Sequence, residues 1–176
     1  YSLNSASGFL TYKYSATEGT KNMISIAFSK YGYVYTSQVA DTDDPGGILA
    51  YRLNSATGDL TFIERETSPN KHANRLIMHS NGKYIYSSFG TNSEIALYYV
   101  SSDGSLSFVE IISTGLYSPP SGLEYTSYVD LHIDSTGSFL YAFSNQRTPI
   151  NVYKIDQYTG RLEYSGQTST GIQWPF

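Results

Sequence analysis

Two short motifs recur along this chain of 176 residues, and both recur at intervals near 50 residues. The first ends in a glycine that follows Ser, Thr or Asp, and these glycines lie 50, 46 and 56 residues apart, at positions 8, 58, 104 and 160. The second has a glycine followed within four residues by a closing tyrosine; its glycines lie at 32, 82 and 137. Two independent motifs with one period predict a fold built from stacked repeats.

Each repeat has the pattern of several short strands. The segments 48–53, 95–100 and 150–155 have apolar residues at their first, third and sixth positions and tyrosine at their fourth. Enrichment in Tyr, Val and Ile favours strands, and a glycine after Ser, Thr or Asp supplies the positive φ of a tight turn. The middle repeat predicts strands at about 74–79, 83–88, 94–100 and 106–112, and we expect almost no helix.

Four antiparallel strands in each unit of 40–50 residues are typical of a β-propeller blade. A β-sandwich is the alternative, because it also has short strands at regular intervals, but it does not explain the repeat. The prediction is an all-β chain with about three and a half four-stranded blades of a seven-bladed ring. It comprises 1–15 as the end of one blade, 22–68, 72–115 and 127–169 as full blades, and 170–176 as the start of the next.

Such a partial ring needs the remaining blades as its partner, from the same parent chain or from a second copy. Tyr1 takes the place that Tyr51, Tyr98 and Tyr153 have in their strands, which favours a segment of a longer polypeptide. The composition restricts the other classes of partner that we expect. The net charge is −4 with no Lys/Arg cluster, so nucleic acid is not expected; no apolar run is long enough to span a membrane, and without cysteine there is no thiolate chemistry. Cytoplasmic and secreted locations are both allowed.

Two stretches resemble the seven-bladed lactonase family, which includes the bacterial 6-phosphogluconolactonase type and the fungal carboxy-cis,cis-muconate cyclase. The general resemblance is the pattern Gly-Lys-Tyr-hydrophobic-Tyr, followed by Ile-x-Val-Tyr-x-Ile-Asp-x-x-Thr-Gly-x-Leu. The first stretch, similar to a family blade that opens with His-x-Asn, is Lys71-His72-Ala73-Asn74 followed by Asn81-Gly82-Lys83-Tyr84. The second, similar to the family's Glu-Ile-His blade, is Asp130-Leu131-His132-Ile133 followed by Gly137-Ser138-Phe139-Leu140-Tyr141 and Ser144-Asn145-Gln146-Arg147.

The resemblance implies a hydrolase or cyclase that acts on a small anionic lactone or carboxylate, without a metal or other cofactor. It implies that His72 or His132 is the base, that Asp130 orients a histidine, and that Arg75 or Arg147 binds the substrate's anionic group, with Asn74 beside it. The repeat alignment itself places Asp130 at the position of Arg75. Because Asp130 and His132 are two residues apart, they share one strand face. We expect this face to point toward the central channel of the propeller.

Structural interpretations compete with each of these roles. His132 can be a partly buried, hydrogen-bonded strand residue, His72 a loop residue, and Arg75 and Arg147 solvated charges. His79, which precedes a turn, is expected at the surface, and the tyrosines are expected to pack between blades. The acidic loop 41–44 reads as solvated rather than as a Ca²⁺ site. The alternative function is a non-catalytic propeller that acts as a scaffold for protein or glycan binding.

Overall fold

Every regular element in the described part of the chain is a β-strand. The computed structural model describes residues 2–3, 10–11, 23–40, 42–67, 73–89, 93–116, 129–144 and 149–168. Three antiparallel four-stranded sheets follow one another, and we call them blades 1, 2 and 3. Blade 1 consists of β3 (Met23–Ser29), β4 (Tyr33–Gln38), β5 (Gly47–Leu53) and β6 (Leu60–Glu66). Blade 2 consists of β7 (Ala73–Met78), β8 (Tyr84–Phe89), β9 (Glu94–Val100) and β10 (Leu106–Ser113).

Blade 3 and a short hairpin complete the described elements. Blade 3 consists of β11 (Val129–Ile133), β12 (Phe139–Ser144), β13 (Ile150–Ile155) and β14 (Leu162–Thr168). The hairpin pairs β1 (Ser2–Leu3) with β2 (Leu10–Thr11). The strands of blade 2 agree with the predicted bounds to within one residue. None of the described residues forms a helix, so there is none that could span a membrane.

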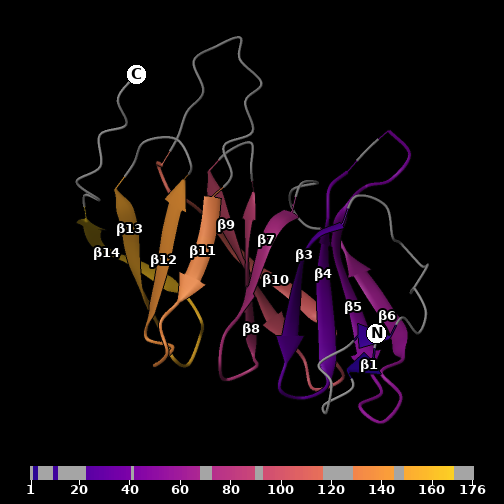
Figure 1. Cartoon of the computed structure of the whole chain (residues 1–176). Helices are drawn as coiled ribbons and strands as arrows, with labels where there is room; N and C mark the ends of the chain where they lie inside the picture. The colour runs from indigo at the N-terminus through magenta and orange to yellow at the C-terminus, as the bar shows by residue number, and fades with distance from the viewer. Residues whose placement is uncertain are drawn as a thin grey trace.

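Each blade is a meander in which consecutive strands are neighbours, and the first strands of the blades lie together. The sheets stand side by side in Figure 1, with β3 next to β7 and β7 next to β11. Strands β4 and β8 are buried at every residue, and each is an inner strand of its sheet. The predicted all-β propeller fold is therefore confirmed, and its three separate sheets differ from the two facing sheets of a sandwich.

Two apolar clusters hold the blades together. One lies between blades 1 and 2 and includes Tyr35, Ile85 and Tyr98; the other lies between blades 2 and 3 and includes Tyr86, Leu97 and Leu140. Burial of a side chain of this size contributes about 1.5–3 kcal/mol. Because the sheets have no strand–strand hydrogen bonds between them, this packing is the main attraction between blades.

Tyrosines on the second strands of blades 1 and 2 bind the turn of the next blade. Tyr33 and Tyr35 of β4 donate hydrogen bonds to the carbonyls of Ser102 (2.8 Å) and Gly104 (2.9 Å). In the same way, Tyr84 and Tyr86 of β8 donate to the carbonyls of Tyr158 and Gly160, at 2.6 Å for the Tyr86–Gly160 bond. We call each set of contacts between adjacent blades a joint. The expected packing of tyrosines between blades is confirmed, and it comes with specific hydrogen bonds.

The turn glycines are required at these joints for two reasons. Gly104 and Gly160 have φ angles of 91° and 73°, which disfavour other residues. A Cβ at Gly104 would lie 2.4 Å from the Tyr33 ring, and one at Gly160 would lie 2.6 Å from the Tyr84 ring. The repeated glycine therefore forms the turn and leaves room for the tyrosine of the preceding blade.

Candidate functional site

Two of the predicted site residues meet where the first strands of blades 2 and 3 adjoin. The Arg75 Nε atom on β7 lies 3.7 Å from the Asp130 Oδ1 atom on β11, and the two side chains are 47% and 48% exposed. An ion pair that is this open to water contributes about 0–1 kcal/mol to stability. The pair therefore does little to hold the blades together, and both groups remain accessible to a ligand.

The alternation of β11 explains why its polar residues face outward. Val129 and Leu131 are buried in the cluster with blade 2, with Ile133 packed against them. Asp130 and His132 lie between these residues, so they occupy the opposite face of the strand, and His132 is exposed. The predicted shared face is thus present, and His132 is not the partly buried histidine of the competing interpretation.

A buried serine connects the backbones of the two strands. The Ser88 hydroxyl on β8 donates to the Val129 carbonyl on β11 at 2.6 Å and accepts a longer bond from the Arg75 amide at 3.4 Å. Ser88 is fully buried, so water does not compete for these bonds. The strand segments that carry Arg75 and Asp130 are therefore fixed relative to each other, whereas their side-chain ends are free to reorganise.

The other predicted site residues do not join this exposed group in the described part of the chain. Asn74 is only 5% exposed, and its carbonyl accepts a 2.6 Å hydrogen bond from the Ser37 hydroxyl of blade 1. His72 and Arg147 lie outside the described residues. Asp130 accepts a hydrogen bond from the amide of Leu131 at 3.0 Å, and none of the described hydrogen bonds joins it to His132. Of the predicted site residues, Arg75, Asp130 and His132 therefore remain as the candidate site in the described part of the chain.

The prediction that His79 lies at the surface is wrong. Its side chain is 2% exposed, its Nε2 atom lies 2.8 Å from the Gly137 carbonyl, and its Nδ1 atom accepts a hydrogen bond from the Asn81 amide at 3.1 Å. Because Nδ1 is the acceptor, the proton lies on Nε2, which donates to Gly137. The turn of blade 3 covers this histidine, so it serves the joint between blades 2 and 3.

In the acidic loop of blade 1, the Asp44 carboxylate is paired within the protein, whereas the sequence predicted a solvated loop. Its Oδ1 atom lies 2.6 Å from Arg65 Nη1 and accepts a 2.9 Å hydrogen bond from the Gly46 amide. The Gly46 bond and the Arg65 guanidinium hold the pKa of the Asp44 carboxyl below its usual value. Asp41 lies outside the described residues. Across the ranges that the structure describes, no group of three or more His, Cys, Asp or Glu side chains is arranged to hold a metal ion.

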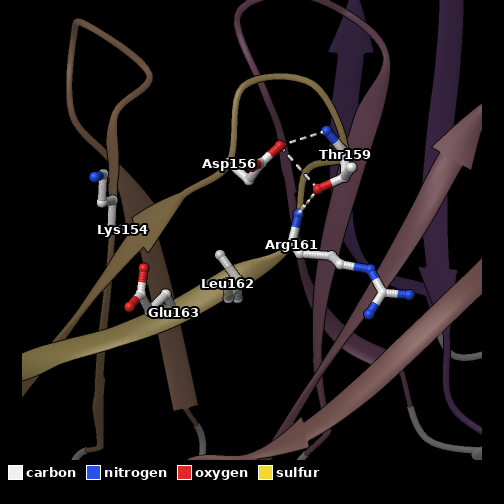
Figure 2. Close-up of a pocket in the computed structure, with 6 residues that line it drawn as sticks. All are labelled: Lys154, Asp156, Thr159, Arg161, Leu162 and Glu163. Atoms are coloured by element: carbon white, nitrogen blue, oxygen red, sulfur yellow. Dashed lines mark hydrogen bonds between the residues drawn. The ribbon is translucent and has the colours of Figure 1, made fainter.

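A shallow pocket lies at the β13–β14 hairpin, away from the pair on β7 and β11. It is lined by Lys154, Asp156, Thr159, Arg161, Leu162 and Glu163. Figure 2 shows that the Asp156 carboxylate is used within the turn, where it accepts from the Thr159 amide at 2.7 Å and the Thr159 hydroxyl at 2.9 Å. These bonds hold the pKa of Asp156 below its usual value. The carboxylate stabilises the turn that Tyr84 and Tyr86 bind, and the pocket is not our candidate site.

Comparison with known proteins identifies the family. A sequence profile described as "Lactonase, 7-bladed beta-propeller" matches residues 1–112 and, in a second match, residues 76–175. The chain belongs to this lactonase family. Membership confirms the resemblance seen in the two histidine-containing stretches, and it places the three blades in a family whose ring has seven.

Relatives of the lactonase family extend beyond the matched region. A 6-phosphogluconolactonase of Pectobacterium atrosepticum is 29% identical over 127 residues, which are 69% of this chain and 36% of the relative. Among solved structures, a Lactobacillus plantarum protein has a TM-score of 0.75 at 16% identity and covers 95% of this chain and 47% of its own. The periplasmic gluconolactonase of Pseudomonas aeruginosa has a TM-score of 0.61 at 17% identity, with coverages of 87% and 42%. At these identities the two structures support the fold alone.

Proposed function

We propose that the lactonase-family site of this protein opens or forms a small anionic lactone without a metal, and that Arg75, Asp130 and His132 belong to this site. The observation that carries the proposal is the 3.7 Å pair of Arg75 and Asp130 across two blades, with His132 exposed on the face of Asp130. Unlike charges and an imidazole on one accessible surface are suited to binding an anion and moving a proton.

Arg75 is the proposed binding group for the carboxylate or phosphate of the substrate. A guanidinium has five N–H donors in a fixed plane, and a carboxylate or phosphate can accept two of them at once. The long Nε–Oδ1 distance and the exposure of both partners make the pair with Asp130 easy to exchange for a ligand. We expect an anionic substrate to take Arg75 from Asp130, which leaves the carboxylate able to hydrogen-bond a protonated histidine.

His132 is the proposed base. In hydrolysis it takes a proton from water as the water oxygen attacks the lactone carbonyl, and the bond between that carbon and the ring oxygen then breaks. The ring oxygen leaves as a hydroxyl after it receives this proton from His132, and the new carboxylic acid ionises to a carboxylate. Formation of the lactone from the hydroxy acid is the same path in reverse. His72 is the second candidate for the base, and Arg147 is the second candidate for the anion.

The name of the sequence relative supports this substrate class. The Pectobacterium relative is a 6-phosphogluconolactonase. A phosphorylated sugar lactone would offer Arg75 a phosphate, whereas an unphosphorylated one would not. The pair of substrates therefore separates binding through the anionic group from catalysis at the ring.

Hydrolysis of phosphorylated and unphosphorylated gluconolactone, followed as acid release above the spontaneous rate, tests the proposal. We expect His132→Ala to lower kcat by about 100-fold or more, as loss of a general base does. Arg75→Ala is expected to raise KM for the phosphorylated lactone by about 10-fold or more, the loss of one charge-assisted hydrogen bond. The control is Arg161→Ala, an arginine on the outer hairpin whose ion partner is Glu110. We expect no change in activity when a chelator is added.

Unchanged turnover in His132→Ala would reject this residue as the base and direct the search to His72. Absence of lactone turnover in the unmodified protein would favour the propeller as a scaffold for protein or glycan binding. Loss of activity with a chelator would reject metal independence while leaving the substrate class in place.

A further inference from the structure

The first strand of blade 2 departs from regular strand geometry at Arg75. The pairing of β7 with β8 shifts its register between Ala73 and Leu76. The two residues between them, Asn74 and Arg75, lie opposite one residue of β8, Ser88, and this arrangement is a β-bulge. Ala73 and Leu76 both pack in the cluster between blades 1 and 2, although a regular strand would place them on opposite faces. The bulge therefore changes the direction of the side chains where the candidate site begins.

Serine hydroxyls accept hydrogen bonds from the backbone amides at this bulge. The Arg75 amide donates to the Ser88 hydroxyl of the same blade at 3.4 Å, and the Leu76 amide donates to the Ser25 hydroxyl of blade 1 at 3.1 Å. Ser25 is half-buried on β3, the strand that lies beside β7 in Figure 1. The peptide groups on the two sides of the Arg75 Cα atom are thus held, one from blade 2 and one from blade 1.

Blade 1 has an equivalent bulge, and it also makes a contact with the next blade. The register of β3 against β4 shifts between Met23 and Ser25, and Ser25 precedes Arg75 by one repeat of 50 residues. The Ser25 side chain reaches the first strand of blade 2, just as the Arg75 side chain reaches Asp130 on the first strand of blade 3. The two contacts are consecutive, because the first ends on Leu76 and the second starts from Arg75.

The two members of the ion pair are directed in different ways. Between Val129 and Ile133, β11 pairs with β12 without a register shift, so Asp130 follows the regular alternation of a strand. Arg75 lies in the bulge instead, and a bulge that moved by one residue would turn its side chain to the other face of β7. The direction of the guanidinium therefore depends on the bonds that hold the bulge in place.

We propose that Ser25 is a positioning residue for Arg75, so that blade 1 determines how the site between blades 2 and 3 binds the anionic group of its substrate. The Ser25 hydroxyl holds the Leu76 amide, which keeps the bulge in register. The guanidinium then stays within reach of Asp130 in the free protein and of the anion in the complex. The inference rests on the proposed function of this site, and it assigns Ser25 no contact with the substrate.

Two substitutions of nearly equal shape test the hydroxyl of Ser25. Ser25→Thr keeps it, whereas Ser25→Val has a methyl group in its place. We expect Ser25→Val to raise KM for the phosphorylated lactone by about 3–10-fold with kcat unchanged, the effect of one lost hydrogen bond. Ser25→Thr should have the KM of the unmodified protein. KM for the unphosphorylated lactone should be the same in all three proteins, because this substrate offers Arg75 no phosphate.

A double substitution shows whether the effect passes through Arg75. In proteins that carry Arg75→Ala, we expect Ser25→Val and Ser25→Thr to have the same KM, because the group that Ser25 positions is then absent. Ser37→Ala is the matched control. Ser37 donates across the same joint at 2.6 Å, but to the Asn74 carbonyl, so both amides of the bulge remain held. We expect this variant to have the KM of the unmodified protein.

The NMR signal of the Arg75 Nε–H group gives a readout that needs no turnover. We expect this signal to shift in Ser25→Val but not in Ser25→Thr or Ser37→Ala. Ser25→Ala, which adds no methyl groups, is the second variant if valine disturbs the packing of β3. Absence of lactone turnover in the unmodified protein would reject the proposed function, whereas the Nε–H signal would still show whether Ser25 positions Arg75.

Three results would overturn the positioning role of Ser25. The first is an unchanged Arg75 Nε–H signal in both Ser25→Val and Ser25→Ala. The second is an equal rise in KM for the two lactones, because general damage to the site would then be responsible. The third is a difference in KM between Ser25→Val and Ser25→Thr that persists when Arg75 is replaced by alanine.

Discussion

The joint between blades 1 and 2 and the joint between blades 2 and 3 share the same set of hydrogen bonds. They differ in the residues on the first strands of the blades. In both, two tyrosines bind a glycine turn, and a serine donates at 2.6 Å to a carbonyl on the first strand of the next blade: Ser37 to Asn74, and Ser88 to Val129. On the first strands, Ser25 of β3 holds the position of Arg75 and Asp130, and its hydroxyl accepts a 3.1 Å hydrogen bond from the Leu76 amide of β7. In the next joint the same positions are held by Arg75 and Asp130, which form the exposed ion pair. The common contacts hold the blades together, and the residues that differ include those of the proposed site.

The same contrast appears at the turn between the first and second strands. A Cβ at Gly82 of blade 2 would lie 2.7 Å from the ring of Tyr31, and one at Gly137 of blade 3 would lie 2.9 Å from the His79 ring. Tyr31 is 59% exposed, whereas His79 is 2% exposed and hydrogen-bonded. Glycine leaves room for a ring in both joints, but only the His79 ring, which lies against Gly137 of blade 3, is buried. The comparison implies that the second joint depends more on its turn.

The largest expected effect acts on both joints at once, through alkaline pH. Burial raises the pKa of the Tyr35, Tyr86 and Tyr98 hydroxyls above the ordinary value of 10.0. Because the folded-state pKa is the higher one, this stability is fully present below pH 10.0 and is lost as the pH rises above it. We expect tyrosinate absorbance from these residues to appear together with loss of the strand signal in circular dichroism. Ionisation of all 18 tyrosines near pH 10 with the fold intact would contradict this.

The next effect separates a glycine inside a joint from one outside. Gly160→Val combines a positive φ with a clash against Tyr84, and we expect it to lower the free energy of unfolding by about 2–6 kcal/mol. At Gly58, where φ is 79° and a Cβ would meet nothing within 4 Å, valine should cost only the backbone strain, about 1–3 kcal/mol. Urea unfolding measures both. Equal losses would mean that the tyrosine does not require the space.

A smaller effect distinguishes the two ring contacts at the first turns. His79→Ala should lower the free energy of unfolding by about 1–3 kcal/mol, because it removes a buried ring and leaves the half-buried Asn81 amide without its acceptor. The Gly137 carbonyl keeps a 2.8 Å bond from Gln157, which limits the loss. Tyr31→Ala, at the exposed counterpart, is expected to change stability by less than about 1 kcal/mol. A larger loss in Tyr31→Ala than in His79→Ala would reverse our ranking of the two joints.

The equivalent serines of the two joints, Ser37 and Ser88, should contribute almost equally to stability but differ in their effect on activity. Ser37→Ala and Ser88→Ala each remove a buried hydrogen bond between blades, so we expect both to cost about 1–2 kcal/mol in urea unfolding. Only Ser88 contacts the backbone of Arg75, so only Ser88→Ala should raise KM for an anionic lactone. Ser88→Thr, which keeps the hydroxyl, should have the same KM as the unmodified protein. The same KM in both alanine variants would mean that Ser88 has no positioning role.

The repeat made the fold predictable, because two motifs with one period define the strands and turns of each blade. The face shared by Asp130 and His132 was also predictable, since strand alternation needs no knowledge of the neighbours. The repeat alignment equates Arg75 with Asp130, which indicates adjacent positions on neighbouring first strands, but an ion pair depends on side-chain rotamers that alternation does not determine.

The burial of His79 could not be predicted from its own surroundings. The segment His79-Ser-Asn-Gly82 has the composition of an exposed turn, and the residue that covers it, Gly137, is 58 positions away. The available signal was the absence of a side chain at Gly137, which leaves a space for a ring. Asp44 is a similar case, because this loop residue has its partner, Arg65, 21 positions away on β6.

The tyrosine-to-glycine hydrogen bonds also determine when a blade can be completed. Tyr35 and Gly104 are separated by 69 residues, and Tyr86 and Gly160 by 74. A blade emerging from the ribosome therefore has no acceptor for its tyrosines until the third and fourth strands of the next blade are made. At about 5–20 residues per second, this delay lasts about 4–14 s. Throughout synthesis the newest blade keeps an apolar face uncovered, so that face is where chaperones would act.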